Sequence, residues 1–590
     1  MKRIILITIL FACVFTFSRC SEADFDEKYR DPGKSSTVEL PKLFAGTLLL
    51  SKEWAMSTYG RFFGWEAQVL VKQANTIGIT LDNNTFYRLE GYTDGMPPYG
   101  DLAKMISSWH FMQSVFEALP EAEKPASEAY MLAAETQLYA MTAYIMSSFG
   151  DIPFDEVGQV AVTGDISKAH PKYQDDQEIY GRILDRLGEL NTRFAAVAEP
   201  DPLFKGQDFI NRGDLDKWRR YVNSVRLRVA LLVSANGALA SKGQGVIAEI
   251  LGNASNNPVI ETNDQNVCIA QVNKSGSALD VNGGSGFDWI NLRIASTEMI
   301  KRMQKAGDGG VWVDGQDDPR LPILFCLATV NGEFAVLTPE EEVVADPPKN
   351  GKAVPKVFRG ACAAMDYNVW ETYLYPSANR AYFSYIRENG FFKNNRNWDN
   401  PIITAAEVSF IKAEAFQRGW AQGDAKAAFK TAIKQSVDFY FKYQDNRTAH
   451  ESQITGTSST SYSFRVVINN AKPTDAWIDK FADDRWSSRI DGSSYTEQLE
   501  AILEQKWLNF GYMYAGEQWN DLRRTGYPRM SYQKDRDPNA EIPYPCNRLR
   551  YPENERNNNT NFSTQVGSQD NYKDVLFWAK PDWHDGPTWQ

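Results

Sequence analysis

The chain has 590 residues, of which 43% are hydrophobic, and its formal net charge is −12. Such a chain can bury a large core, and its acidic balance argues against nucleic acid as a partner, because phosphate binding depends on clustered Lys and Arg. The spacing of the six cysteines contains no CxxC pair, which argues against a zinc site or a disulfide scaffold. Any pairing among Cys268, Cys326, Cys362 and Cys546 stays open.

The first twenty residues have the pattern of an export signal. Lys2 and Arg3 precede an apolar run from Ile4 to Phe17, which is shorter than the roughly 20 residues that span a bilayer. Cys20 follows this run, and its position resembles the lipid-attachment site of a bacterial lipoprotein. An ordinary secretory signal cleaved nearby is the alternative, because Arg19 stands where such signals carry a small residue.

The leader suggests a division of the chain into three parts. Residues 1–19 are predicted to be the signal peptide, and residues 20–40 a lipidated tether whose start is acidic and resembles a surface-export signal. Residues 41–590 contain no Pro/Gly/Ser-rich linker, and no later stretch is apolar and long enough to cross a membrane. We therefore expect them to form one large domain.

Helical periodicity dominates this domain. Residues 127–148 place small and apolar side chains on one helix face, and residues 404–441 predict a pair of Ala-rich helices that begins at Thr404. A turn with Gly419 and Gly423 joins the pair, which resembles a tetratricopeptide unit. Further helices are predicted near 45–75, 102–118, 177–196, 214–236, 291–306 and 497–513. The expected fold is mainly α, with long irregular loops and few short strands.

Six segments in chain order resemble motifs of one family, the SusD/RagB nutrient-binding lipoproteins of Bacteroidetes. They are YIMSSFGDIPF (144–154), DFINRGDLDKWRRYVNSVRLRVA (208–230), DDPRLP (317–322), AEVSFIKAEAF (406–416), WLNFGYMYAGEQWNDLRRTGYPR (507–529) and PYP with RLRYP (543–552). The resemblance implies a SusD-like helical protein that faces the outside of the cell outer membrane. It also implies that the protein binds an oligosaccharide, or in some members a peptide, and delivers it to a SusC-like TonB-dependent transporter.

The charged and glycine residues of these motifs are predicted to be structural. Gly150 is expected to end a helix, Asp214 to cap one, and Arg226 and Arg228 to pair with buried carboxylates. Further charged residues are expected to form partly buried ion pairs that hold loops on the helices, because such pairs more often fix conformation than bind ligand. They are Asp318, Arg320, Asp521, Arg523 and Arg524.

The ligand contacts lie outside the shared motifs and must be inferred from chemistry. Sugar rings stack on Trp and Tyr, and their hydroxyls need amides and charged groups alongside, on loops over a rigid scaffold. Three stretches have this composition: residues 57–65, 282–291 and 366–398. The candidate ligand-binding residues in them are Trp65, Trp289, Trp370, Tyr375, Asn379, Arg396 and Trp398. The alternative for each aromatic residue is an ordinary packed ring.

Catalysis is the competing class of function, and the sequence offers little for it. The four histidines, at 110, 170, 450 and 584, have no metal-ligand spacing, and no nucleophile elbow is present. Gly243-Gln244-Gly245 follows a predicted helix and is interpreted as a turn, not as a dinucleotide fingerprint. The acidic loop from Asp308 to Asp318 lacks the EF-hand spacing. We expect neither a catalytic site nor a cofactor.

Overall fold

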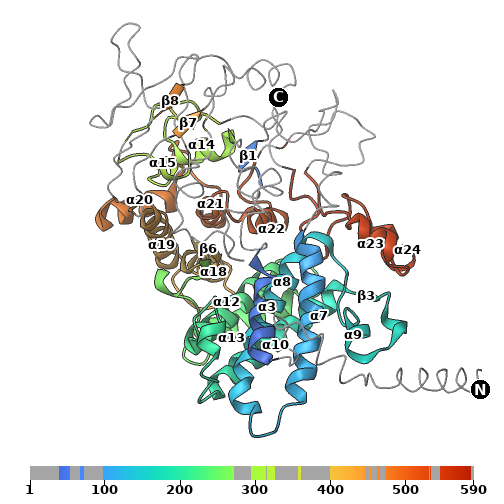
Figure 1. Cartoon of the computed structure of the whole chain (residues 1–590). Coiled ribbons are helices and arrows are strands. Elements are labelled where there is room, and N and C mark those ends of the chain that lie inside the picture. The colour runs from blue at the N-terminus through green and yellow to red at the C-terminus, as the bar shows by residue number, and fades with distance from the viewer. Residues whose placement is uncertain are drawn as a thin grey trace, which may run out of the picture.

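A computed structural model describes the greater part of the chain. The described residues are 39–52, 67–71, 97–270, 294–313, 315–325, 357–360, 384, 399–445, 452–454, 462–464, 472–530, 532 and 545–585. The described part is mostly helical with short two-stranded sheets, which confirms the predicted fold class (Figure 1). Cys20 and the signal peptide lie outside it. None of the described helices has both the length and the hydropathy that a bilayer-spanning segment needs.

One group of helices surrounds α8 (Lys124–Phe149). Side chains on every face of α8 are buried from Ala129 onward, as expected for a helix in the centre of a large core. Its neighbours occupy the lower part of Figure 1. They are α3 (Leu40–Leu49), α7 (Pro97–Glu117), α10 (Asp176–Ala196) and α12 (Leu215–Ser234), and α13 (Ala240–Gly252) packs on α10 and α12.

A second group contains the tetratricopeptide-like pair. Helices α18 (Ala405–Gln417) and α19 (Ala425–Asp445) are antiparallel neighbours, and Gly419 adopts the positive φ that their connection requires. The group also includes α20 (Asp475–Ser487), α21 (Gln498–Phe510) and α22 (Ala515–Thr525). Because α12 contacts both α8 and α18, it joins the two groups into one core.

Short elements complete the described part. The sheets pair β1 (Leu70–Val71) with β5 (Ile294–Ala295), β2 (Ile152–Pro153) with β3 (Tyr173–Gln174), β4 (Val267–Ala270) with β6 (Asp399–Ile403), and β7 (Ser452–Ile454) with β8 (Tyr462–Phe464). The short α-helices are α9 (Gln159–Thr163), α11 (Phe204–Gln207), α14 (Thr297–Met303), α15 (Leu321–Leu324), α23 (Glu553–Asn558) and α24 (Phe562–Gln565). The 3-10 helices are Ile166–Lys168, Asn263–Gln265 and Gly567–Gln569.

The predicted helix ends are confirmed by their capping contacts. The Asp214 carboxylate accepts a hydrogen bond from the Lys217 N–H at 3.0 Å, and the Thr404 hydroxyl accepts one from the Glu407 N–H at 3.3 Å. Gly150 has a φ of 79° and donates its N–H to the Met146 carbonyl. These contacts satisfy backbone groups that a helix end leaves without partners.

Three predictions about local structure were wrong in part or in whole. Of the helix predicted near 45–75, α3 covers the start and ends at Leu49, residues 53–66 lie outside the described part, and residues 70–71 form β1 instead. The helix predicted over 291–306 is confined to α14 because β5 precedes it. Gly243 and Gly245 lie inside α13, not in a turn. A Cβ at Gly243 would lie only 2.6 Å from the Ala230 carbonyl oxygen, so this glycine serves close packing of α13 on α12.

Candidate ligand-binding site

The predicted ligand-binding residues all lie outside the described part of the chain. They are Trp65, Trp289, Trp370, Tyr375, Asn379, Arg396 and Trp398. The residues that border their segments are described, however, and these show where each segment starts and ends. We call the bordering set of β1, β4, β5, β6 and Ser384 the anchoring strands.

The register of β4 and β6 brings two candidate segments to the same point. Ala270, the last residue of β4, pairs with Asp399, the first residue of β6. Ala270 precedes the Gly-rich segment with Trp289, and Asp399 directly follows Trp398. Because the strands are antiparallel, the described residue that precedes residues 271–293 lies beside the described residue that follows residues 385–398.

The β1–β5 pair brings the early segment next to the Gly-rich one. Leu70 pairs with Ala295, and the Ser296 N–H donates to the Val69 carbonyl at 3.1 Å. Trp65 lies two residues before Ala67, where the description of this strand region starts. The described residues that follow Trp65 and those that follow Trp289 are therefore neighbours.

Ser384 places the third segment at the same sheet. Its carbonyl accepts a hydrogen bond from the Ala295 N–H at 2.8 Å, and its own N–H donates to the Arg359 carbonyl at 2.7 Å. Gly360 and Ser384 flank residues 361–383, which contain three of the seven candidates. The described residues on both sides of 361–383 are therefore linked to β5 through Ser384.

A buried tryptophan fixes the anchoring strands to the helices. The Trp507 indole N–H on α21 donates to the Ala67 carbonyl at 2.9 Å, and the side chain is 1% exposed. The Arg302 guanidinium on α14 lies 5.8 Å from the ring centroid, within the range of a cation–π contact. The strand near Trp65 is thus held by the scaffold.

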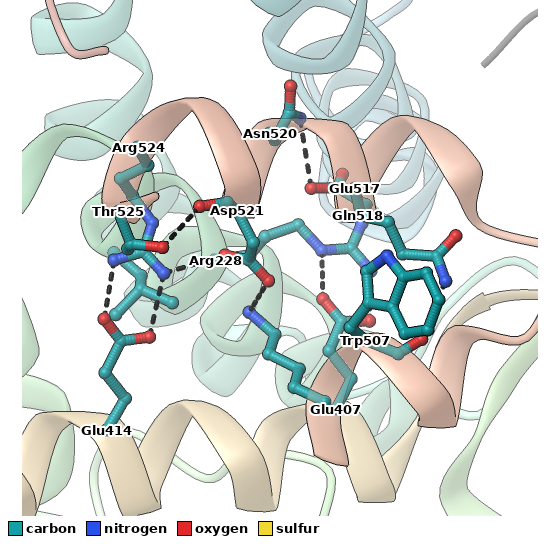
Figure 2. Close-up of polar contacts among 12 residues, drawn as sticks. Arg228, Glu407, Glu414, Trp507, Glu517, Gln518, Asn520, Asp521, Arg524 and Thr525 are labelled. Carbon is teal, nitrogen blue, oxygen red and sulfur yellow. Dashed lines mark hydrogen bonds and ion pairs between the residues drawn. The ribbon is translucent and has the colours of Figure 1, made fainter. Parts of the chain in front are cut away.

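Arg228 attaches strand β6 to the helices. Its Nε and Nη2 donate to the two Glu407 carboxylate oxygens, each at 2.6 Å, and Nη2 also donates to the Ile402 carbonyl of β6 at 2.8 Å (Figure 2). Glu517 lies 3.8 Å from Nη1. One guanidinium therefore connects α12, α18, α22 and the anchoring strands, as the motif predicts for Arg228.

A second arginine joins α18 to α22 in the same network. Arg524 forms a bidentate ion pair with Glu414 at 2.6 and 2.8 Å and also donates a hydrogen bond to Asp521 (Figure 2). Asp521 forms a second ion pair, with Lys506 at 2.9 Å. Burial on its own raises the pKa of Glu414, but Arg524 and Arg418 outweigh that effect and hold it well below its usual range. The predicted ion pairs of Asp521 and Arg524 are confirmed.

The DPRLP motif and its acidic loop are also structural. Arg320 pairs with Asp318 at 2.6 Å and donates to Ser436 and Gln505, and all of these atoms are buried. The Asp317 carboxylate accepts the Lys305 and Val313 N–H groups at 2.6 and 2.7 Å. These carboxylates hold the backbone of the loop, which explains their number without a bound metal.

Arg226 and Arg523 are the remaining arginines that were predicted to form ion pairs. Arg226 pairs with Glu249 at 2.7 and 3.0 Å, as predicted. The contacts described for Arg523 are with aromatic rings, an amide oxygen and backbone carbonyls, and its predicted ion pair stays a prediction. The Arg523 guanidinium lies 3.4 Å from the Trp519 ring centroid and donates to the Asn547 and Ser147 carbonyls. It therefore attaches the C-terminal segment to the end of α8.

The profile of one protein family, described as SusD-like, starch-binding and associating with the outer membrane, matches residues 98–552. The chain belongs to the SusD-like family. The family description is of binding proteins that associate with the outer membrane. No curated protein matches the chain.

Solved structures share this SusD-like fold at low sequence identity. A chitin-binding protein has a TM-score of 0.64 at 18% identity, over 91% of this chain and 100% of its own. A Bacteroides vulgatus outer membrane protein, described as probably involved in nutrient binding, has a TM-score of 0.64 at 20% identity, over 92% and 100%. A chitin-binding SusD homologue from Flavobacterium johnsoniae has a TM-score of 0.60 at 17% identity, over 91% and 97%.

Proposed function

We propose that this SusD-like protein binds an oligosaccharide at the cell surface and delivers it to a SusC-like TonB-dependent transporter. The observation that supports the proposal is that the described residues bordering three aromatic- and amide-rich segments are hydrogen-bonded to one another in the anchoring strands. Two of the structural neighbours are described as chitin-binding, which supports a glycan as the ligand.

The proposed contacts are the predicted aromatic and polar residues. Trp370, Tyr375 and Trp289 are the principal stacking residues, with Trp65 and Trp398 beside them. Asn379 and Arg396 supply hydrogen bonds to sugar hydroxyls. A rigid scaffold under such a site lowers the entropic cost of binding for any contact residue that it holds in place.

Oligopeptide capture on the same scaffold is the second candidate. It would depend on backbone hydrogen bonds more than on ring stacking. Calorimetric titration of Trp370→Ala, Tyr375→Ala and Trp289→Ala with chito- and malto-oligosaccharides separates the two. We expect each substitution to weaken glycan binding at least tenfold, with Trp420→Ala, in the α18–α19 connection, as the aromatic control. Unchanged glycan affinity in all three variants, with saturable binding of a peptide pool, would favour the peptide alternative.

The proposed location is the outer face of the outer membrane, with Cys20 as the lipid-attachment site and residues 20–40 as the tether. Two signals support it: the leader sequence and membership of an outer-membrane family. Cys20→Ser is expected to release the protein from the membrane fraction and to abolish labelling by a radioactive fatty acid. Retention of both properties would contradict lipidation at Cys20.

A further inference from the structure

A partly exposed tryptophan, Trp477, lies in the first turn of α20, a helix at the left edge of Figure 1. One face of its ring stacks on the buried ring of Phe481, with the centroids 5.1 Å apart and the planes at 14°. The Arg485 guanidinium supports Phe481 in turn, 5.4 Å from its centroid. The indole N–H donates to the Gly315 carbonyl at 3.0 Å. Because Phe481 covers one face, the exposed part of the indole belongs to the opposite side.

The turn that Trp477 contacts is held by hydrogen bonds of its own. The Asp317 carboxylate accepts the Val313 N–H at 2.7 Å. The Val313 carbonyl accepts the N–H groups of Gln316 and Asp317 at 3.2 and 3.1 Å. The ring and the turn are therefore in position before any ligand arrives, which lowers the entropic cost of binding one.

Apolar side chains are concentrated beside this ring. Six large hydrophobic side chains are exposed in the described part of the chain, and two of them lie on the segment that leads into Gly315. They are Val311, which is 46% exposed, and Val313, which is 38% exposed. Single exposed apolar residues are ordinary on a protein surface, but a group that includes a tryptophan indicates a contact surface.

Polar groups that can bind hydroxyls flank the ring. Gln316 is exposed on the turn, where its amide oxygen accepts the Lys305 ammonium at 3.2 Å and its amide nitrogen can donate to a ligand. Asp475, two residues before Trp477, binds Lys434 through Oδ2 at 2.6 Å and can accept through Oδ1.

This combination of groups suits a saccharide. The C–H face of a sugar ring stacks on an indole, and its hydroxyls both donate to a carboxylate and accept from an amide. The apolar surface of one tryptophan and two valines is small for a stable protein interface, which buries about 800 Å² on each partner. A single sugar ring matches it better.

We propose that Trp477, with Gln316 and Asp475 beside it, forms a second saccharide-binding site. The site consists of α20 and the turn at 313–317, outside the anchoring strands, so it is additional to the proposed glycan contacts and does not depend on them. Two separate contacts on one chain raise the affinity for a polysaccharide more than for a short oligosaccharide, because both can engage the same polymer.

Affinity electrophoresis in gels that contain glycol chitin or amylopectin tests the proposal. We expect at least one of these polymers to retard the native protein, and Trp477→Ala to weaken that binding roughly tenfold. Trp477→Phe keeps a ring on Phe481 and should retain most of the binding, although it loses the hydrogen bond to Gly315. Trp420→Ala removes another partly exposed tryptophan, whose ring is covered by Arg418 at 4.9 Å, and should bind as the native protein does.

Equal retardation of the native protein and Trp477→Ala by both polymers would overturn the proposal, as would a native protein that neither polymer retards. Equal losses in Trp477→Phe and Trp477→Ala would also overturn it, because the indole would then serve only to hold the turn. If Trp477→Ala does not fold, Gln316→Ala changes an exposed side chain and should weaken the binding in its place. Trp370→Ala tests the proposed glycan site separately: native-like binding by this variant beside a weakened Trp477→Ala would leave the second site standing without the first.

Discussion

At the scale of single residues, the buried arginines hold this protein together. Arg228 and Arg524 bridge elements that are far apart in the chain through buried carboxylates, and Arg320 pairs with its neighbour Asp318 and reaches distant helices through Ser436 and Gln505. A buried pair is not strongly stabilising against an apolar replacement, but removal of one partner leaves an uncompensated charge. These residues therefore fix the arrangement of helices more than they add net stability.

Glu414→Gln tests this role. Arg524 and Arg418 would lose their shared charge partner inside the core, so we expect the free energy of unfolding to fall by about 3 kcal/mol. Urea unfolding followed by fluorescence measures the change. Asp484→Asn breaks the exposed pair with Lys480 and should cost less than about 1 kcal/mol. Equal losses in the two variants would contradict the assigned role.

The lowered pKa of Glu414 predicts how stability depends on pH. A carboxyl whose pKa is depressed in the folded state stabilises the protein when ionised, and this contribution is lost as pH falls below its ordinary value of 4.5. Between pH 6 and pH 3 the native protein should therefore lose more stability than Glu414→Gln. Parallel curves of unfolding free energy against pH would show that Glu414 contributes nothing to acid sensitivity.

The sequence indicated which charged residues are structural but not their partners. Six residues that were predicted to form ion pairs do form them: Arg226, Arg228, Asp318, Arg320, Asp521 and Arg524. Glu414 and Glu517 could not be predicted as partners, because they lie on other helices and only tertiary packing brings them together. Arg523 and Arg524 are adjacent on the same helix and look alike in the sequence. The Arg523 guanidinium nevertheless lies over the rings of Trp519 and Trp578.

At the scale of elements, close helix packing depends on particular glycines. Gly243→Ala should push α13 away from α12, because the new Cβ would lie 2.6 Å from the Ala230 carbonyl oxygen. We expect a loss of about 1–3 kcal/mol, typical of overpacking. Gly245→Ala lies in the same helix with open space around it and should stabilise the protein by up to about 1 kcal/mol. Thermal unfolding compares the two, and a stabilising Gly243→Ala would contradict the packing argument.

We expect a substitution that loosens the attachment of the anchoring strands to the helices to weaken ligand binding as well. Trp507→Phe removes the N–H that satisfies the buried Ala67 carbonyl, which should cost about 1–3 kcal/mol of stability and weaken glycan binding. Trp583→Phe also removes a buried indole N–H, in this case from Asn547, but far along the chain from the anchoring strands. It should affect stability alone. Equal glycan affinities in the two variants would mean that the strands do not position the site.

Long helices could be predicted and short strands could not. The periodicity over 127–148 and 404–441 is sustained for several turns, so α8, α18 and α19 follow from it. Strands β1 and β5 are two residues each, too short to show alternation, and they exist because distant segments pair. The candidate ligand segments were recognised by composition, but the pairing of the described residues that border them was not visible in the sequence.

At the scale of the whole molecule, the two helix groups form one scaffold through α12, and the anchoring strands are attached to it by Trp507 and Arg228. The family comparison identifies an outer-membrane binding protein, and solved structures share its fold. A large helical core suits that task, because it supports irregular segments that determine which ligand is bound.

Calorimetric titration of the purified native protein with a panel of oligosaccharides tests the central claim most directly. We predict saturable binding of at least one oligosaccharide class, with the sugar recovered chemically unchanged. Cleavage of the bound sugar, or binding of peptides in the absence of any glycan binding, would contradict the account.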